Sequence, residues 1–174
     1  DYASLKDFAA VGLLFRSGDD YIWKTHSFAR KEFLDKYKLK PPIHEWEKKG
    51  LLTIVDEPTI NPKHIIDWFI EAQKNYGLQK VVADNFRMDL LRPLFEDAGI
   101  EYEVIKNTRA IQSLLAPRVE DMFAQHHLIF GDNPLMRWYT QNVAVKIRKD
   151  GNKEYEKKEP IRRKTDGFQA LIHA

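Results

Sequence analysis

The alternation of strand-like and helix-like segments in the middle of the chain limits the fold most. Three short apolar, partly β-branched runs are separated by patterns in which apolar side chains recur at helical spacing. The runs are 51–55, 78–83 and 101–105, and the helical patterns are 62–77, 85–98 and 108–126. This order is typical of parallel strands joined by crossover helices. We therefore expect an α/β fold built around a sheet.

The segments before this region predict a β-hairpin followed by two short helices. An apolar run at 8–15 and an alternating run at 21–28 flank a polar turn at 16–20, the pattern of two antiparallel strands. Residues 29–50 are charged, with scattered aromatic side chains, and Pro41-Pro42 interrupts them. We interpret this stretch as two helices joined by an extended break, forming an insertion or a lid.

The last third of the chain predicts a helix, a second hairpin and a final helix. Asn133-Pro134 is a helix-start signal, and Asp150-Gly151 between two alternating segments is the strongest short hairpin signal. Thr165 or Asp166 is expected to cap a helix over 167–173. The predicted fold is a mixed sheet flanked by helices, with an additional C-terminal β-hairpin, in one domain that spans 1–174.

The composition argues against several classes of protein, namely disulfide-linked proteins, thiolate metal proteins, membrane proteins and ATPases with a phosphate-binding loop. The 174 residues carry a net charge of +2 and include no cysteine, which excludes disulfides and thiolate metal sites. No apolar run is long enough to cross a bilayer, and no leader pattern opens the chain, so no membrane partner is expected. These features predict a soluble cytoplasmic protein. The chain contains no phosphate-binding loop of the Gly-x-x-x-x-Gly-Lys-Ser/Thr type, so we expect no ATPase in it.

Two aspartates occupy positions suited to metal binding. Asp84 ends the central apolar run, and Asp166 opens the C-terminal helix, where α/β sheets usually place ligands. Carboxylate oxygens are the ligands that Mg²⁺ and Mn²⁺ prefer. Each acid taken alone is also explained as an ordinary helix cap. Convergence of distant acids at one edge would distinguish a metal site from two caps.

Four motifs occur in order along the chain. They are Asp1-Tyr-Ala-Ser-Leu-Lys-Asp-Phe-Ala-Ala, Val-Ala-Asp84-Asn-Phe-Arg87, Asn133-Pro-Leu-Met-Arg-Trp138 with Asn142-Val, and Arg163-Lys-Thr-Asp166-Gly-Phe-Gln-Ala-Leu. With these motifs the chain resembles the C-terminal nuclease domain of the large terminase subunit of tailed double-stranded DNA bacteriophages, which has an RNase H-like fold.

The resemblance implies an endonuclease that cuts concatemeric viral DNA with two Mg²⁺ or Mn²⁺ ions. It assigns Asp1, Asp84 and Asp166 as the metal ligands and catalytic acids, in a host cytoplasm. The implied partners are double-stranded DNA and, in the full-length protein, an ATPase domain, the small terminase subunit and the portal. Because Asp1 is the first residue, the strand expected to hold it is missing or cut short, as in an excised domain. Asp7 therefore remains a rival for the first ligand.

A basic segment at 146–164 is the candidate DNA-binding surface. The residues assigned to this role are Lys146, Arg148, Arg162, Arg163 and Lys164. Cations on a protruding hairpin can follow a phosphate backbone. Alternating Lys and Glu can also simply solvate an exposed hairpin and protect its edges. Both interpretations stay open for the hairpin, whereas 162–164 lies beside Asp166 and is expected to face DNA.

Two other functions fit parts of the same pattern. A nonenzymatic DNA-binding or assembly module would keep the fold and the basic hairpin without holding metals. Another RNase H-like nuclease, such as a junction resolvase, would share the acids but not the 133–138 motif or the closing motif.

Overall fold

The N-terminal hairpin begins the main sheet, with β2 (Asp20–Arg30) as its central strand and β1 (Ala9–Ser17) at its edge. In the computed structural model, which describes residues 1–174, β1 pairs antiparallel with β2. β3 (Leu52–Val55) and the two-residue β6 (Leu128–Ile129) pair with β2 in the parallel sense. The predicted hairpin is confirmed, and the sheet is mixed as expected.

Helices α1 (Lys31–Lys36) and α2 (Ile43–Lys48) follow the hairpin, on either side of the prolines. Phe33, Ile43 and Trp46 are all buried and belong to the larger hydrophobic core. The two predicted helices are therefore present, but the expectation of an insertion or a lid is wrong, because their apolar side chains are part of that core.

The middle of the chain alternates two helices with two strands that pair in parallel. α3 (Pro62–Tyr76) leads to β4 (Val81–Asp84), and α4 (Met88–Asp97) leads to β5 (Tyr102–Ile105), which lies parallel to β4. The Asn61 side chain accepts a hydrogen bond from the Lys63 amide at 2.9 Å, and Gly77 ends α3 with a φ of 63°. The helix agrees with the helical pattern predicted over 62–77, and Asn61 and Gly77 cap its two ends.

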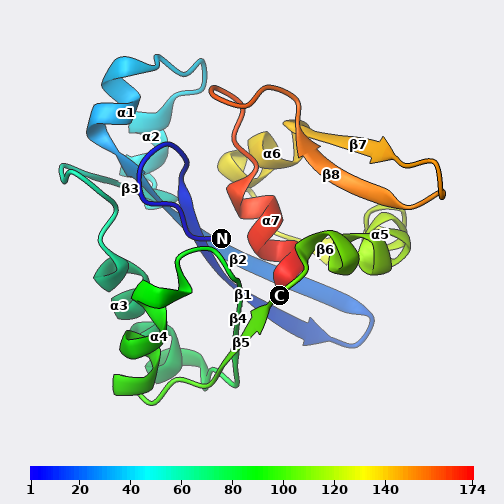
Figure 1. Cartoon of the computed structure of the whole chain (residues 1–174), viewed down its shortest axis with the longest axis horizontal. Coiled ribbons are helices and arrows are strands. Elements are labelled where there is room, and N and C mark those ends of the chain that lie inside the picture. The colour runs from blue at the N-terminus through cyan, green and yellow to red at the C-terminus, as the bar shows by residue number, and fades with distance from the viewer.

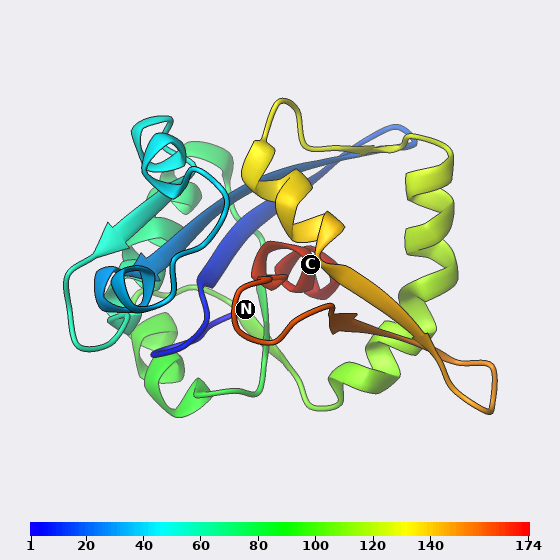
Figure 2. The same cartoon turned by 90° about the horizontal axis from the view of Figure 1, so that it is seen from above.

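Helices cover both faces of β1, as its alternating side chains require (Figures 1 and 2). Phe8 and Ala10 point into the larger core, which also holds α6 (Pro134–Gln141) and α7 (Asp166–His173). Ala9 and Val11 point into the second core, with α3 and α4. The strand is thus buried on both sides. No helix is long and apolar enough to cross a membrane.

The second hairpin packs against the long helix α5 (Thr108–Ala124), as Figure 2 shows. Its strands are β7 (Val143–Ile147) and β8 (Lys153–Lys157). The Gln112 side chain accepts a hydrogen bond from the Tyr155 amide at 3.2 Å, and Lys153 Nζ lies 2.7 Å from both carboxylate oxygens of Glu120. Strand β8 of the predicted hairpin is therefore anchored to α5 from its middle to the end nearest the turn, while residues 148–152 of the turn are exposed.

The strands form three separate sheets rather than one continuous sheet. β1, β2, β3 and β6 form the first, β4 pairs only with β5, and β7 pairs with β8. β4 also begins at Val81, three residues later than the predicted strand start at Leu78. Pairing with β5 begins only at Val81, opposite Tyr102, and β1 does not pair with β4, so 78–80 has no strand beside it. A groove separates the two strands.

Gly167 permits the close approach of α7 to Tyr139. A Cβ at this position would lie 2.4 Å from Tyr139 Cδ2, and the Tyr139 ring is fully buried with its hydroxyl 2.8 Å from Ser27 Oγ. We expect Gly167→Ala to destabilise the protein by about 1–3 kcal/mol, because neither partner has room to move.

A second background tests that explanation by urea unfolding. In Tyr139→Ala protein the ring is absent, so Gly167→Ala should be neutral or stabilising, because Ala favours helix over Gly by about 1 kcal/mol. An equal loss in both backgrounds would show that the ring contact is not the cause.

Candidate active site

Four aspartates from distant parts of the sequence line one pocket of about 620 Å³. Asp1 and Asp7 come from the segment before β1, Asp84 from the end of β4, and Asp166 from the start of α7. Lys157 and His173 also line this pocket. The structure thus brings together the three acids that the sequence analysis assigned to metal binding, together with the rival Asp7.

Asp84 does not cap the helix that follows it. Its Oδ1 accepts a hydrogen bond from the Phe86 amide at 3.2 Å, which closes a tight turn after β4. The N-cap of α4 is Arg87, in the left-handed conformation with a φ of 52°. The carboxylate therefore stays partly exposed at the strand end, where the pocket opens.

Asp166 is the first residue of α7, and it is only 2% exposed. The cap of this helix is Thr165, which makes no side-chain capping bond. Asn142 holds the preceding turn, because its Nδ2 donates to the Lys164 carbonyl at 2.8 Å. Asp166 Oδ2 is buried without a hydrogen-bond partner in the protein. An unpartnered carboxylate oxygen facing a pocket is free to accept a ligand.

The charge state of Asp166 follows from this burial. Loss of solvation raises the pKa of the carboxyl to about 6, and Asp7 acts in the same direction. Lys157 and Lys164 oppose the shift because their positive charges favour the carboxylate. A nearby cation would lower this pKa and restore the charged form.

Asp1 extends the sheet by one residue pair at the edge of β1. Asp1 and Ala10 exchange two backbone hydrogen bonds. The Ala10 amide donates to the Asp1 carbonyl at 2.8 Å, and the α-amino group of Asp1 donates to the Ala10 carbonyl at 3.0 Å. The Tyr2 hydroxyl donates to the Ile60 carbonyl at 2.7 Å and holds the segment. Burial lowers the pKa of the α-amino group, whereas Asp84 and Asp166 raise it. The Asp84 and Asp166 carboxylates therefore lie near the Asp1 amino group.

Asp7 is engaged by two lysines. Its Oδ1 lies 2.6 Å from Lys157 Nζ and 2.7 Å from Lys164 Nζ. Burial by itself would raise the pKa of Asp7, but the bonds from both lysines outweigh it and hold the pKa below its ordinary value. Asp1 differs from Asp7 in that its carboxylate makes no hydrogen bond or ion pair in the protein.

The carboxylates suit a hard divalent cation but do not form a closed cage. No three Asp, Glu, His or Cys side chains are close enough together to hold an ion by themselves. Mg²⁺ commonly binds through one or two carboxylates and keeps several waters, so a closed cage is not required. The unpartnered Asp166 Oδ2 and the free Asp1 carboxylate supply suitable oxygens. The donor set therefore fits Mg²⁺ or Mn²⁺ with water as additional ligands.

The predicted DNA-binding residues fall into three groups. Lys146 and Arg148 are exposed but paired within the hairpin, with Glu156 at 3.2 Å and Glu154 at 2.6 Å. Arg162 and Arg163 are exposed, and their side chains make no ion pair. Lys164 is 1% exposed, and its ammonium also donates to the Lys6 carbonyl at 2.8 Å. It therefore lies inside the protein beside Asp7.

Sequence reasoning did not identify Lys157 and His173 as members of the site. His173 is buried, neither ring nitrogen has a hydrogen-bond partner, and burial lowers its pKa to about 4. A single histidine in the last turn of a helix gives no indication in the sequence that it lines a pocket. Lys157 is one of several lysines in the hairpin, and only its bond to Asp7, 150 positions away in the chain, distinguishes it.

Comparison with known proteins gives one family match over the whole chain. The family described as "Terminase large subunit, endonuclease domain" matches residues 1–174. No curated protein matches the chain.

Solved phage structures share the fold. The large terminase of bacteriophage HK97 superimposes with a TM-score of 0.84 at 16% identity, over 97% of this chain and 36% of that one. The large terminase nuclease of thermophilic phage G20c gives 0.65 at 12% identity, over 99% and 76%. The same nuclease with bound magnesium gives 0.64 at 12% identity, over 100% and 76%. The predicted RNase H-like α/β fold is confirmed.

The raised pKa of Asp166 predicts how stability depends on pH in EDTA. An unfolded Asp loses its proton near pH 4, whereas the folded one keeps it to about pH 6. Asp166 therefore lowers the free energy of unfolding as pH rises between these values, by about 3 kcal/mol.

Asp166→Asn removes this titration, so the free energy of unfolding of the variant should not fall in this way. As pH rises from about 4 to 6, the variant should become more stable relative to the wild type. Urea unfolding from pH 4 to 7 measures it. Asp35→Asn, at an exposed site on α1, should follow the wild-type curve. Parallel curves for wild type and Asp166→Asn would contradict the assignment.

Proposed function

The chain belongs to the family of terminase large subunit endonuclease domains, and we propose that residues 1–174 are a single metal-dependent nuclease domain that cuts double-stranded viral DNA during genome packaging. The observation that carries this proposal is the pocket into which Asp1, Asp84 and Asp166 converge. The three acids are separated by most of the chain, and local helix capping explains neither Asp84 nor Asp166.

Asp1, Asp84 and Asp166 are the proposed ligands of two Mg²⁺ or Mn²⁺ ions. The G20c nuclease has been solved with bound magnesium, which supports the metal class. Bound ions of this kind supply an activated water and neutralise charge on a departing oxygen. We assign the first ligand to Asp1 rather than Asp7, because the Asp7 carboxylate is engaged by Lys157 and Lys164.

The residues around the three acids offset their negative charge and hold their side chains in position. Lys157 and Lys164 hold Asp7, and they offset part of the negative charge beside Asp166. The bond from Asn142 to the Lys164 carbonyl fixes the turn before α7 and so fixes the direction of the Asp166 side chain. Arg162 and Arg163 lie in the same connection, exposed and unpaired, and are the proposed contacts to the phosphate backbone. Lys146 and Arg148 can join them only by leaving their acid partners.

We place the domain in the packaging machinery of a phage in its host cytoplasm. The chain spans 36% of the HK97 large terminase, so the activity of a whole terminase is a proposal for this protein. In that setting the substrate is concatemeric DNA, and the partners are an ATPase domain, the small terminase subunit and the portal.

A nonenzymatic DNA-binding module is the second candidate. One observation favours it: no three acids are close enough to hold an ion without further ligands. Such a module would bind DNA with the same salt dependence but would never nick a plasmid.

We expect Asp84→Asn and Asp166→Asn to reduce plasmid cleavage in Mg²⁺ or Mn²⁺ by at least about 100-fold, which is the upper end of the loss seen when only outer-shell partners of a metal are changed. EDTA should abolish cleavage by the wild type. The measurement is conversion of supercoiled plasmid to nicked and linear forms, with circular dichroism to check the fold.

Asp35→Asn is the matched control, because it removes one exposed carboxylate that does not line the pocket and should cut normally. Full activity of either site variant would overturn the nuclease assignment. Salt-sensitive DNA binding by a wild type that cuts at no Mn²⁺ concentration would favour the nonenzymatic module. Cleavage confined to four-way junctions would indicate a junction resolvase.

Replacing both Arg162 and Arg163 with Ala should weaken binding of duplex DNA uniformly across sequences. The slope of log K against log salt should become shallower by roughly 0.9 for each phosphate that the variant no longer neutralises. Fluorescence anisotropy of labelled DNA in Ca²⁺ buffer measures this slope. Replacing both Lys146 and Arg148 with Ala is the comparison, and it should change the slope less because each charge is already paired.

A further inference from the structure

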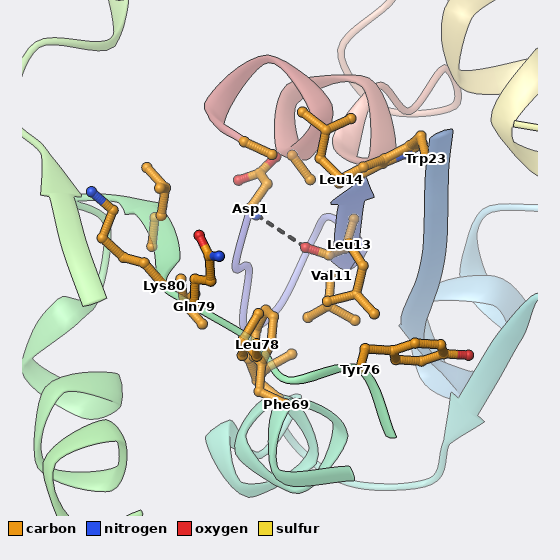
Figure 3. A pocket seen from close by; sticks show the side chains of 18 of the residues that line it. Asp1, Val11, Leu13, Leu14, Trp23, Phe69, Tyr76, Leu78, Gln79 and Lys80 are labelled. Carbon is orange, nitrogen blue, oxygen red and sulfur yellow. Dashed lines mark hydrogen bonds between the residues drawn. The ribbon is translucent and has the colours of Figure 1, made fainter. Parts of the chain in front are cut away.

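The acid pocket adjoins the groove between β1 and β4, and the two are lined differently. The groove, of about 600 Å³, is mostly hydrophobic, and Val11, Leu13 and Leu78 lie on its walls (Figure 3). The acid pocket is lined mainly by polar and charged residues. One of its few hydrophobic residues, Phe86, is nevertheless 53% exposed and belongs to neither hydrophobic core. The packing of the protein therefore does not account for this side chain.

Phe86 also differs from the other exposed aromatic residue of the chain, Tyr76. The Tyr76 ring packs edge-on against Phe15, with 5.4 Å between the ring centres, and Lys24 Nζ lies 5.0 Å from its centre. Phe86 has no such aromatic or cationic partner. It is thus the one exposed aromatic ring that the protein leaves free, and it lines the pocket that holds the acids.

The turn after β4 holds Phe86 in a defined position. Its amide donates to Asp84 Oδ1 at 3.2 Å, and the next residue, Arg87, has a φ of 52°. Such a left-handed conformation is uncommon for a residue other than glycine. The Arg87 guanidinium donates to both carboxylate oxygens of Asp89, at 3.2 and 3.3 Å, which holds the far end of the turn. The ring is therefore presented at the pocket only two residues from a proposed metal ligand.

The connection between β5 and α5 emerges beside this turn. Because Asp84 pairs with Ile105 in the parallel β4–β5 register, the residues after the two strands lie at the same edge. Lys106 directly follows β5, and Arg109 lies in the first turn of α5. Both are exposed, and neither side chain makes an ion pair or a hydrogen bond. Thr108, between them, lines the acid pocket. Two unpaired cations and one free aromatic ring thus occupy the carboxyl edge of β4 and β5.

This combination is complementary to a single nucleic-acid strand. Cations contact the phosphates of such a strand, and an exposed ring stacks on its bases whatever their identity. In a duplex, each base face is covered by the next base pair, so a side chain reaches it only by unstacking or kinking the DNA. Arg162 and Arg163 have no exposed aromatic residue beside them in the sequence, so they offer contacts to phosphate alone. The two basic surfaces therefore suit different forms of DNA.

We propose that the carboxyl edge of β4 and β5 binds single-stranded DNA, with Phe86 stacked on a base and with Lys106 and Arg109 on phosphates of the same strand. A strand held at this edge lies next to Asp84, so the acid pocket receives DNA that has been opened locally. This consequence for cleavage rests on the proposed function, whereas the binding of the strand does not.

The first experiment measures DNA binding by fluorescence anisotropy in Ca²⁺ buffer, for the wild type and Phe86→Ala. Three labelled DNAs are compared. They are a single strand of about 16 nucleotides, the upper end of the site sizes of small strand-binding domains, the blunt duplex of the same sequence, and the same strand with abasic sites in place of its nucleosides. The abasic strand keeps every phosphate and removes every base.

Phe86→Ala should weaken binding of the single strand by at least about fivefold, the lower end of the loss expected for one base–aromatic stack. Duplex binding should not change, because the faces of paired bases are covered. The abasic strand should bind equally to both proteins, because the stack is then absent from both. Leu114→Ala removes a side chain that is 74% exposed and does not line the acid pocket, and it should bind like the wild type.

Equal binding of the single strand by the wild type and Phe86→Ala would overturn the proposal. Equal losses for the strand and the duplex would also overturn it, because the ring would then contact the backbone and not a base. A wild type that binds the abasic strand as tightly as the normal strand would have the same meaning.

Phe86→Trp gives a direct readout of stacking, because a base stacked on an indole quenches its fluorescence. The variant should bind the single strand at least as tightly as the wild type. Its fluorescence should fall more on addition of the strand than that of the wild type, whose four tryptophans are buried or half-buried. Equal quenching in the two proteins would contradict the stacking of Phe86.

Replacing both Lys106 and Arg109 with Ala should make the slope of log K against log salt for the single strand shallower by roughly 0.7 for each lost phosphate contact. Replacing both Lys48 and Lys49 with Ala is the control. It removes two exposed, unpaired lysines at the end of α2 and should leave the slope unchanged. Equal changes in the two double variants would indicate a general effect of charge and refute the assignment.

These binding assays separate the inference from the nuclease assignment, because none of them requires DNA to be cut. Strand binding that depends on Phe86, in a protein that cuts no plasmid in Mn²⁺, would support the strand site and refute the nuclease. Plasmid cleavage by a wild type whose strand binding does not depend on Phe86 would do the reverse.

Discussion

The packing of α7 against β1 is the constraint on which the rest of the structure depends. Every residue of this helix except Gln169 is buried. The helix lies at the centre of the molecule (Figure 1). Its apolar residues, such as Phe168 and Leu171, drive the burial. Asp166 and His173 belong to the same helix and are buried together with these apolar residues. A buried carboxylate without a partner is unfavourable, so its presence in a stable helix is typical of a functional position.

The lysines around Asp7 show how the protein tolerates such a concentration of acids. Lys164 is buried, but its ammonium bonds to Asp7 and to a carbonyl, and it lies 4.4 Å from the centre of the Phe33 ring. A buried ammonium needs this set of partners to remain charged. Lys157 approaches the same carboxylate from the hairpin. The hairpin therefore supports the site through its base, while its turn stays exposed.

Local signals made most of the fold predictable. Asn133-Pro134 marks a helix start and Asp150-Gly151 marks a turn by rules that act within a few residues, and each is found where expected. Asp84 and Asp166 were candidates from their positions in the sequence and Asp1 from the resemblance, whereas their convergence in one pocket depends on long-range packing. The burial of Lys164 could not be predicted, because its partner Asp7 lies 157 positions away. The missing pairing of β1 with β4 is likewise invisible, since both sequences have the pattern of ordinary strands.

The contacts between the two ends of the sequence also govern when the acid pocket exists. Asp7 meets Lys157 and Lys164 only after nearly the whole chain is available, and contacts of such separation form slowly because a long loop must close first. A molecule in which α7 has not packed against β1 does not hold Asp166 in the pocket beside Asp1 and Asp84. The acids are therefore gathered only in the fully packed molecule, so local unfolding of this one helix is enough to take the pocket apart.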